Sequence, residues 1–128
     1  MRIFKNTWFD RFADREGITD DELREVVNRV ETGQADANLG GGVYKVKVAR
    51  PGEGKSGSYR VIVYFRSEER TFFIYGFAKS DRGNVDTGEL RAFKVGAKIN
   101  FSLTDEQIKD RLQKRTLIEV FYEDGHEI

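Results

Sequence analysis

Five cationic side chains and a single carboxylate lie within sixteen residues in the middle of the chain. The cations are Lys45, Lys47, Arg50, Lys55 and Arg60, and the carboxylate is Glu53. Lysine and arginine track a phosphate backbone, and neighbouring aromatic rings accept unstacked bases, so this stretch predicts a site for single-stranded nucleic acid. A solvated strand face with a flexible turn explains the same composition equally well.

Aromatic residues near the cations could supply the stacking surfaces. The tyrosines are Tyr44, Tyr59, Tyr64 and Tyr75. The alternative is that these rings fill the core. Trp8, Phe9 and Phe12 are most simply core residues, although a tryptophan on a short helix also suits a partner interface.

The charges are balanced over the whole chain but not along it. The 128 residues contain 22 Lys and Arg and 22 Asp and Glu, and residues 43–82 carry nine basic and four acidic side chains. The flanking residues 1–42 and 83–128 are net acidic. An RNA partner would therefore meet one basic segment on an acidic scaffold.

The composition excludes several kinds of chemistry. The chain has no cysteine and only one histidine, His126. Disulfides, thiolate metal sites, a cysteine nucleophile and a Ser-His-Asp arrangement are therefore ruled out. Any catalysis must come from lysine, arginine, tyrosine or carboxylates, and we expect neither a metal nor a cofactor.

A phosphate-loop pattern ends in Lys55 and Ser56, provided that Ala49 replaces its first glycine. Such a loop works by delivering phosphate to the N-terminus of a following helix. The alternating residues 59–65 predict a strand there instead. Nucleotide triphosphate hydrolysis is therefore a weak alternative.

Capping signals predict two helix starts. Thr19 with Glu22, and Thr104 with Gln107, each form a capping box flanked by a hydrophobic staple. The first of these helices should end near Gly33. An aromatic run predicts a short helix capped by Thr7 that ends at Gly17, and a fourth helical stripe is formed by Leu90, Phe93, Ala97 and Phe101.

Alternation of period two predicts strands at 43–48, 59–66 and 71–77, with shorter ones at 2–5 and 117–122. Short connections make the three central strands an antiparallel meander. The second and third of them are apolar on both faces, so both faces should be covered. The predicted fold class is α+β: a small antiparallel sheet with two N-terminal helices packed on one face, and C-terminal helices.

The order of these elements and the amino-acid sequence of the middle segment resemble the RelE/HigB superfamily of toxins from bacterial toxin-antitoxin pairs. The resemblance is closest to the HigB-like branch. The matching stretches are GGGVYKVKVAR at 40–50, GEGKSG at 52–57, YRVIVY at 59–64 and YGFAK at 75–79. The resemblance covers roughly residues 1–101 and is strongest over 40–82. It implies a RelE-like toxin domain over 1–128, with 102–128 as a C-terminal extension.

The resemblance implies a metal-independent endoribonuclease that cuts messenger RNA in the ribosomal decoding site. A ribose 2′-hydroxyl attacks the adjacent phosphate, which requires a base, charge stabilisation and an acid. In RelE, lysines and arginines fill most of these roles, and the matching positions here are Lys45, Lys47 and Arg60. We assign Lys45 or Lys47 as the base and Arg60 as the stabiliser.

Further contacts with RNA are expected from Arg50, Lys55, Tyr59, Tyr75, Lys79 and Arg82. RelE places an arginine directly after the lysine that matches Lys79, and a tyrosine a few residues later. This chain has Ser80 and Asp86 at those positions, so either Arg82 or Tyr75 replaces them as the acid, or the catalytic scheme differs from that of RelE.

The expected partners are the ribosome with its messenger RNA and a cognate antitoxin, of helix-turn-helix type as in HigB-like pairs. A ParE-like inhibitor of DNA gyrase without nuclease activity is the main alternative, followed by a degenerate member that only binds RNA or its antitoxin. Paired Lys45 and Lys47 with Arg60 favour the nuclease. No run approaches the ~18 apolar residues of a membrane span, so we expect a cytoplasmic protein without membrane contact.

Overall fold

A computed structural model describes the backbone of residues 1–50 and 54–121, and the side chains of these ranges except those of residues 50 and 54–57. Arg50 and Lys55 are therefore expected RNA contacts whose side chains lie outside the described part. Glu53 and His126, which were not expected to contact RNA, also lie outside the described residues.

The described strands form one sheet in the order β2-β3-β4-β5-β1-β6. They are β1 (Arg2–Asn6), β2 (Ala37–Gly40), β3 (Val43–Arg50), β4 (Gly54–Phe65), β5 (Arg70–Ala78) and β6 (Leu117–Val120). Strand β1 runs parallel to β5, and every other neighbouring pair is antiparallel. The expected three-stranded meander is confirmed as the run from β3 to β5, and β2 adds a further antiparallel strand beside β3.

Four described helices accompany the sheet: α1 (Thr7–Glu16), α2 (Asp20–Glu31), α3 (Thr87–Phe101) and α4 (Asp105–Gln113). The capping boxes at Thr19 and Thr104 are present. Thr7 is not the cap of α1: the side chain of Asn6 accepts the Phe9 N–H at 2.7 Å and takes that role. Asp86 and Glu89 form a third capping box, at the start of α3.

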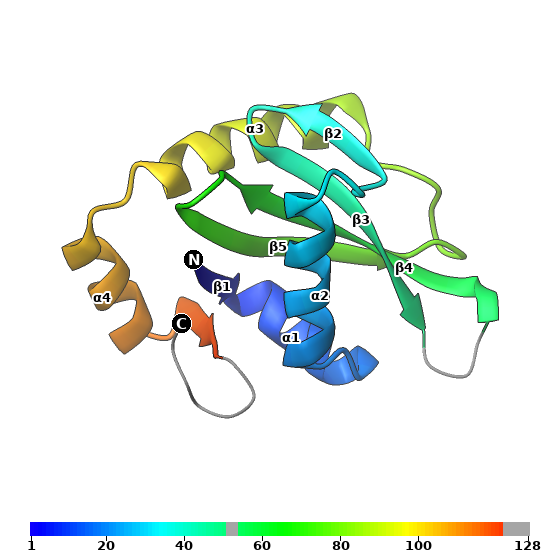
Figure 1. The fold of residues 1–128 in the computed structure, drawn as a ribbon, viewed down its shortest axis with the longest axis horizontal. Helices are drawn as coiled ribbons and strands as arrows, with labels where there is room; N and C mark the ends of the chain where they lie inside the picture. Colours follow the sequence, from blue (N-terminus) through cyan, green and yellow to red (C-terminus); the bar gives the residue numbers. More distant parts are fainter. Residues whose placement is uncertain (51–53, 122–128) are drawn as a thin grey trace.

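Both faces of the sheet are covered, as the apolar strands predicted. Val61 and Val63 of β4 belong to a core with α1 and α2, whereas Ile62 and Tyr64 belong to a second core with α3 and α4. Figure 1 shows α4 and β6 at one end of the sheet, and the end of β3 with the start of β4 at the other.

Strand β2 was not predicted, because its four residues, ANLG, show no alternation of apolar and polar side chains. It pairs with β3 through Ala37 and Lys45. After it, Gly42 adopts a φ of 84°, and a Cβ there would lie 2.7 Å from the Phe101 ring. Only glycine fits this turn, which brings α3 close to the start of β3.

Candidate functional site

The strand register places the three candidate catalytic side chains on one face of the sheet. Lys47 is opposite Arg60, and Arg60 is opposite Phe77. Lys45 is opposite Ile62 in the next row on the same face. Because Val46 between the lysines is buried under α1 and α2, both lysines point to the face that carries α3.

Helix α3 covers only part of that face. It packs on Tyr64 near Gly96 and on Tyr75 through Phe93, with ring centroids 5.9 Å apart. The segment before it reaches Lys45, whose Nζ donates to Asn84 Oδ1 at 3.2 Å. The row of Lys47 and Arg60 lies one step further along the strands.

An aspartate that the sequence analysis missed holds Arg60. The Nε of Arg60 lies 3.2 Å from Asp36 Oδ2, and its Nη1 donates to the buried Ser58 hydroxyl at 2.9 Å. Asp36 Oδ1 also accepts the Lys47 backbone N–H at 3.1 Å. One carboxylate therefore fixes the Arg60 guanidinium beside the backbone of Lys47.

The Lys47 backbone is held from a second side, because Arg29 of α2 donates to its carbonyl at 2.8 Å. In contrast, within residues 1–50 and 54–121 the Lys47 ammonium makes no hydrogen bond or ion pair. A fixed backbone with an unengaged ammonium is the arrangement expected of a group that meets a ligand.

Arg82 is clamped by Glu89. Its Nη1 donates to Glu89 Oε2 at 2.9 Å, its Nη2 bonds the other oxygen, and its guanidinium lies 5.2 Å from the Phe77 ring centroid. The hydrogen bonds from Arg82 lower the pKa of Glu89 to about 2, and those to Glu89 raise the pKa of Arg82. Arg82 is therefore positioned to hold charge, and it is a poor proton donor.

The remaining tyrosines divide between core and surface. Tyr59 and Tyr64 are each 2% exposed, so their rings are core and the expected stacking role of Tyr59 does not fit its position. The Tyr59 hydroxyl donates to Glu16 at 2.6 Å, and burial raises the pKa of Tyr64 to about 12. Tyr75 is only half-buried and lies 4.5 Å from the Trp8 ring.

Lys79 directly follows β5 and is exposed, with its backbone N–H bonded to the Ser58 carbonyl. Lys79 therefore lies next to Ser58 of β4, two residues along the strand from Arg60. The phosphate-loop alternative fails on the fold: Gly54 begins strand β4, so no helix N-terminus follows the Gly-Lys-Ser sequence.

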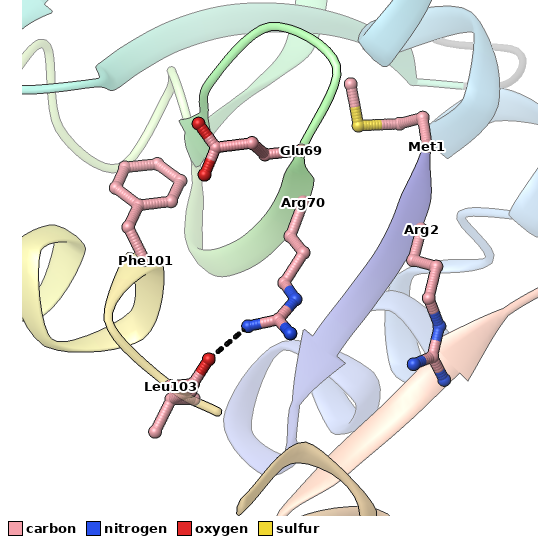
Figure 2. A pocket seen from close by; sticks show the side chains of 6 residues that line it. All are labelled: Met1, Arg2, Glu69, Arg70, Phe101 and Leu103. Atoms are coloured by element: carbon pink, nitrogen blue, oxygen red, sulfur yellow. Dashed lines mark hydrogen bonds between the residues drawn. The ribbon is translucent and has the colours of Figure 1, made fainter. Parts of the chain in front are cut away.

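A cavity of about 400 Å³ lies away from these cations, between the N-terminus, the start of β5 and the link from α3 to α4. Figure 2 shows the Arg70 guanidinium turned toward the Leu103 carbonyl, to which it donates. Arg70 also pairs with Asp105 at 2.6 Å, and Arg2 pairs with Glu119 at 2.8 Å. Arg70 links β5 to α4, and Arg2 links β1 to β6. These contacts indicate a structural role for both arginines.

A comparison with known protein families gives a match over most of the chain. The model of the RelE toxin of the RelE/RelB toxin-antitoxin system matches residues 1–120. The chain belongs to the RelE toxin family. The match continues through α4 and β6, beyond residue 101 where the resemblance was expected to fade.

Membership makes this RelE-family chain a toxin of the kind that pairs with an antitoxin. No helix in the described ranges is both long and apolar enough to cross a membrane. Of the residues that hold the toxin's cationic face together, Asp36 and Asn84 carried no signal in the sequence, since each acts on a partner brought near by the fold. Glu89 was missed although Asp86 and Glu89 have the spacing of a capping box.

Proposed function

We propose that this RelE-family toxin is a ribosome-dependent endoribonuclease that cleaves translated messenger RNA and is neutralised by a cognate antitoxin. The observation that carries the proposal is the face shared by Lys45, Lys47 and Arg60, on which the Lys47 ammonium has no partner among the described residues.

In the proposed reaction, Lys47 in its neutral form takes the proton of the ribose 2′-hydroxyl. The 2′-oxygen attacks the adjacent phosphorus, and the bond from phosphorus to the 5′-oxygen of the next nucleotide breaks. Arg60 stabilises the extra negative charge on the phosphoryl oxygens. The products are a 2′,3′-cyclic phosphate and a 5′-hydroxyl.

The leaving 5′-oxygen needs a proton. Arg82 is unsuited to give one, because its clamp with Glu89 raises its pKa. The Tyr75 hydroxyl, 3.5 Å from Arg82 Nη1, is the better candidate for the acid. Lys45, held by Asn84, acts as a second cation for the phosphate or as an alternative base.

For Arg60 to bind phosphate, its guanidinium must share or exchange its contact with Asp36. Docking in the decoding site would supply the competing phosphate. This requirement agrees with a toxin that acts only on the ribosome, where the substrate is held in one geometry.

The proposed antitoxin is a small helix-turn-helix protein, as in HigB-like pairs, and the proposed place of action is the cytoplasm. Inducing the toxin gene in growing bacteria and mapping transcript ends tests the function. New ends inside translated codons support it. Intact transcripts with altered plasmid supercoiling would instead indicate an inhibitor of DNA gyrase.

A further inference from the structure

A groove runs along β5 where its neighbour β1 stops. The pairing of β1 with β5 ends at Lys5 and Phe73, and β5 continues to Ala78. Helix α1 follows β1 and lies beside this stretch, where it leaves a cavity of about 340 Å³. Trp8 and Phe12 line it from α1, and Tyr75 and Phe77 line it from β5.

The indole of Trp8 is unusually open for a large aromatic side chain. Trp8 remains 43% exposed although its ring lies 5.3 Å from Phe12 and 4.5 Å from Tyr75. Trp8 was most simply expected in the core. Instead, its indole forms an exposed aromatic surface beside the rings of Phe12 and Tyr75. Proteins that bind single-stranded nucleic acid stack bases on exposed aromatic side chains of this kind.

The rest of the cavity wall includes two arginines and two carboxylates, Glu16 and Asp81. The Arg15 guanidinium lies 5.7 Å from the Phe12 ring centroid, and that of Arg82 lies 5.2 Å from Phe77. Both are among the residues that line the cavity. Planar cations beside aromatic rings suit a ligand that is flat and apolar on its faces but carries a phosphate.

The groove is close to the cationic face. Phe77 lines the groove and is opposite Arg60, which is opposite Lys47. Neighbouring strands lie ~4.8 Å apart, so the Cα atoms of Lys47 and Phe77 are separated by roughly 10 Å. A nucleotide beside the one under attack can span such a distance.

We propose that the groove lined by Trp8, Tyr75 and Phe77 binds the base of the messenger RNA nucleotide next to the cleaved bond, with Arg15 and Arg82 contacting its phosphate. The proposal rests on the proposed nuclease function and adds a base-binding subsite to it. Stacking on Trp8 would hold the strand so that the attacked ribose lies over Lys47.

Trp8 is the only tryptophan in the chain, so its fluorescence reports on this groove alone. The probe is a trinucleotide with 2′-O-methyl riboses, which lack the attacking hydroxyl. We expect saturable quenching of Trp8 emission by the trinucleotide and none by ribose 5-phosphate at the same concentration. Arg15→Gln should raise the apparent Kd several-fold, whereas Lys109→Gln on α4 should not change it.

A cleavage assay on programmed ribosomes separates this inference from the function on which it rests. Trp8→Ala should raise KM about tenfold, as loss of one stacked base predicts, while Trp8→Phe stays near wild type. Thermal unfolding of both variants checks the fold. An unchanged KM in folded Trp8→Ala, or no quenching of wild type, overturns the base site even if wild type cleaves. Quenching by a toxin that cleaves nothing would keep the base site and reject the nuclease.

Discussion

At the scale of single residues, the cations of the site differ in how they are held. Lys45, Lys47 and Arg60 could be chosen from the sequence because they alternate with buried residues on two strands. Asp36 could not, because it precedes a strand with no periodic pattern and meets Arg60 only through the sheet. Tyr59 was expected to stack on RNA, yet its side chain is only 2% exposed, because alternation does not tell which face a core will cover.

The different settings of Lys47 and Arg60 predict different costs of removal. Lys47→Ala should leave the free energy of unfolding nearly unchanged, because the ammonium has no partner among the described residues. Arg60→Ala should lower it by about 1–3 kcal/mol, since Asp36 and the buried Ser58 lose their partner. Urea unfolding of both variants measures this. Equal stability of the two would show that the Asp36 contact is not maintained in solution.

The clamp between Arg82 and Glu89 predicts acid sensitivity. Glu89 has a pKa lowered from 4.5 to about 2, so its charge stabilises the fold above its ordinary pKa. That stabilisation should be lost as the pH falls from about 4.5 toward 2. The drop in urea midpoint between pH 6 and pH 3 should therefore be smaller in Glu89→Gln than in wild type.

Glu31→Gln provides a matched control for this comparison, because Glu31 ends α2 at an exposed position away from Arg82. It should show the same drop as wild type. If Glu89→Gln also matched wild type, the ion pair would contribute nothing to folding.

At the scale of helices and strands, local chemistry predicted most elements. The capping boxes at Thr19 and Thr104 and the alternation in β3 to β5 were confirmed because these signals are contained within a few residues. Strand β2, the parallel pairing of β1 with β5 and the cap at Asn6 were missed. The pairings of β2 and β1 depend on segments that are distant in the sequence. The cap was missed because Asn6 and Thr7 are neighbours and both residue types cap helices well.

The packing of α3 on β4 gives a test at this scale. Glycine inside a helix is normally less stable than alanine by up to about 1 kcal/mol, so replacing it should help. At Gly96 a Cβ would lie 2.4 Å from the Tyr64 hydroxyl, too close to be tolerated without movement. Gly96→Ala should therefore destabilise the toxin, as measured by the thermal unfolding midpoint.

Gly88 is the control, because it lies in the same helix and a Cβ there meets only the Asp86 carboxylate at 3.4 Å. Gly88→Ala should be neutral or stabilising. Tyr64→Phe removes the obstructing hydroxyl, so it should recover much of the loss caused by Gly96→Ala. Failure of this rescue would mean that α3 does not pack on Tyr64 as described.

At the scale of the whole molecule, the balanced charge of 22 cations and 22 carboxylates gives little long-range attraction to nucleic acid. The candidate catalytic cations Lys45, Lys47 and Arg60 share one face of the sheet, on the neighbouring strands β3 and β4. Helix α4 and strand β6 lie at the end of the molecule away from the end of β3 (Figure 1). Such a toxin should bind free RNA weakly, leave it uncleaved, and act where the substrate is already positioned.

The most direct measurement is cleavage of a defined messenger RNA by purified toxin, with and without ribosomes. We predict cuts within the codon in the decoding site only when ribosomes are present. Cleavage should fall at least 100-fold in Lys47→Ala, as loss of a general base predicts, and remain normal in Lys109→Ala. Intact messenger RNA on ribosomes with wild-type toxin, or full cleavage by folded Lys47→Ala, would contradict the account.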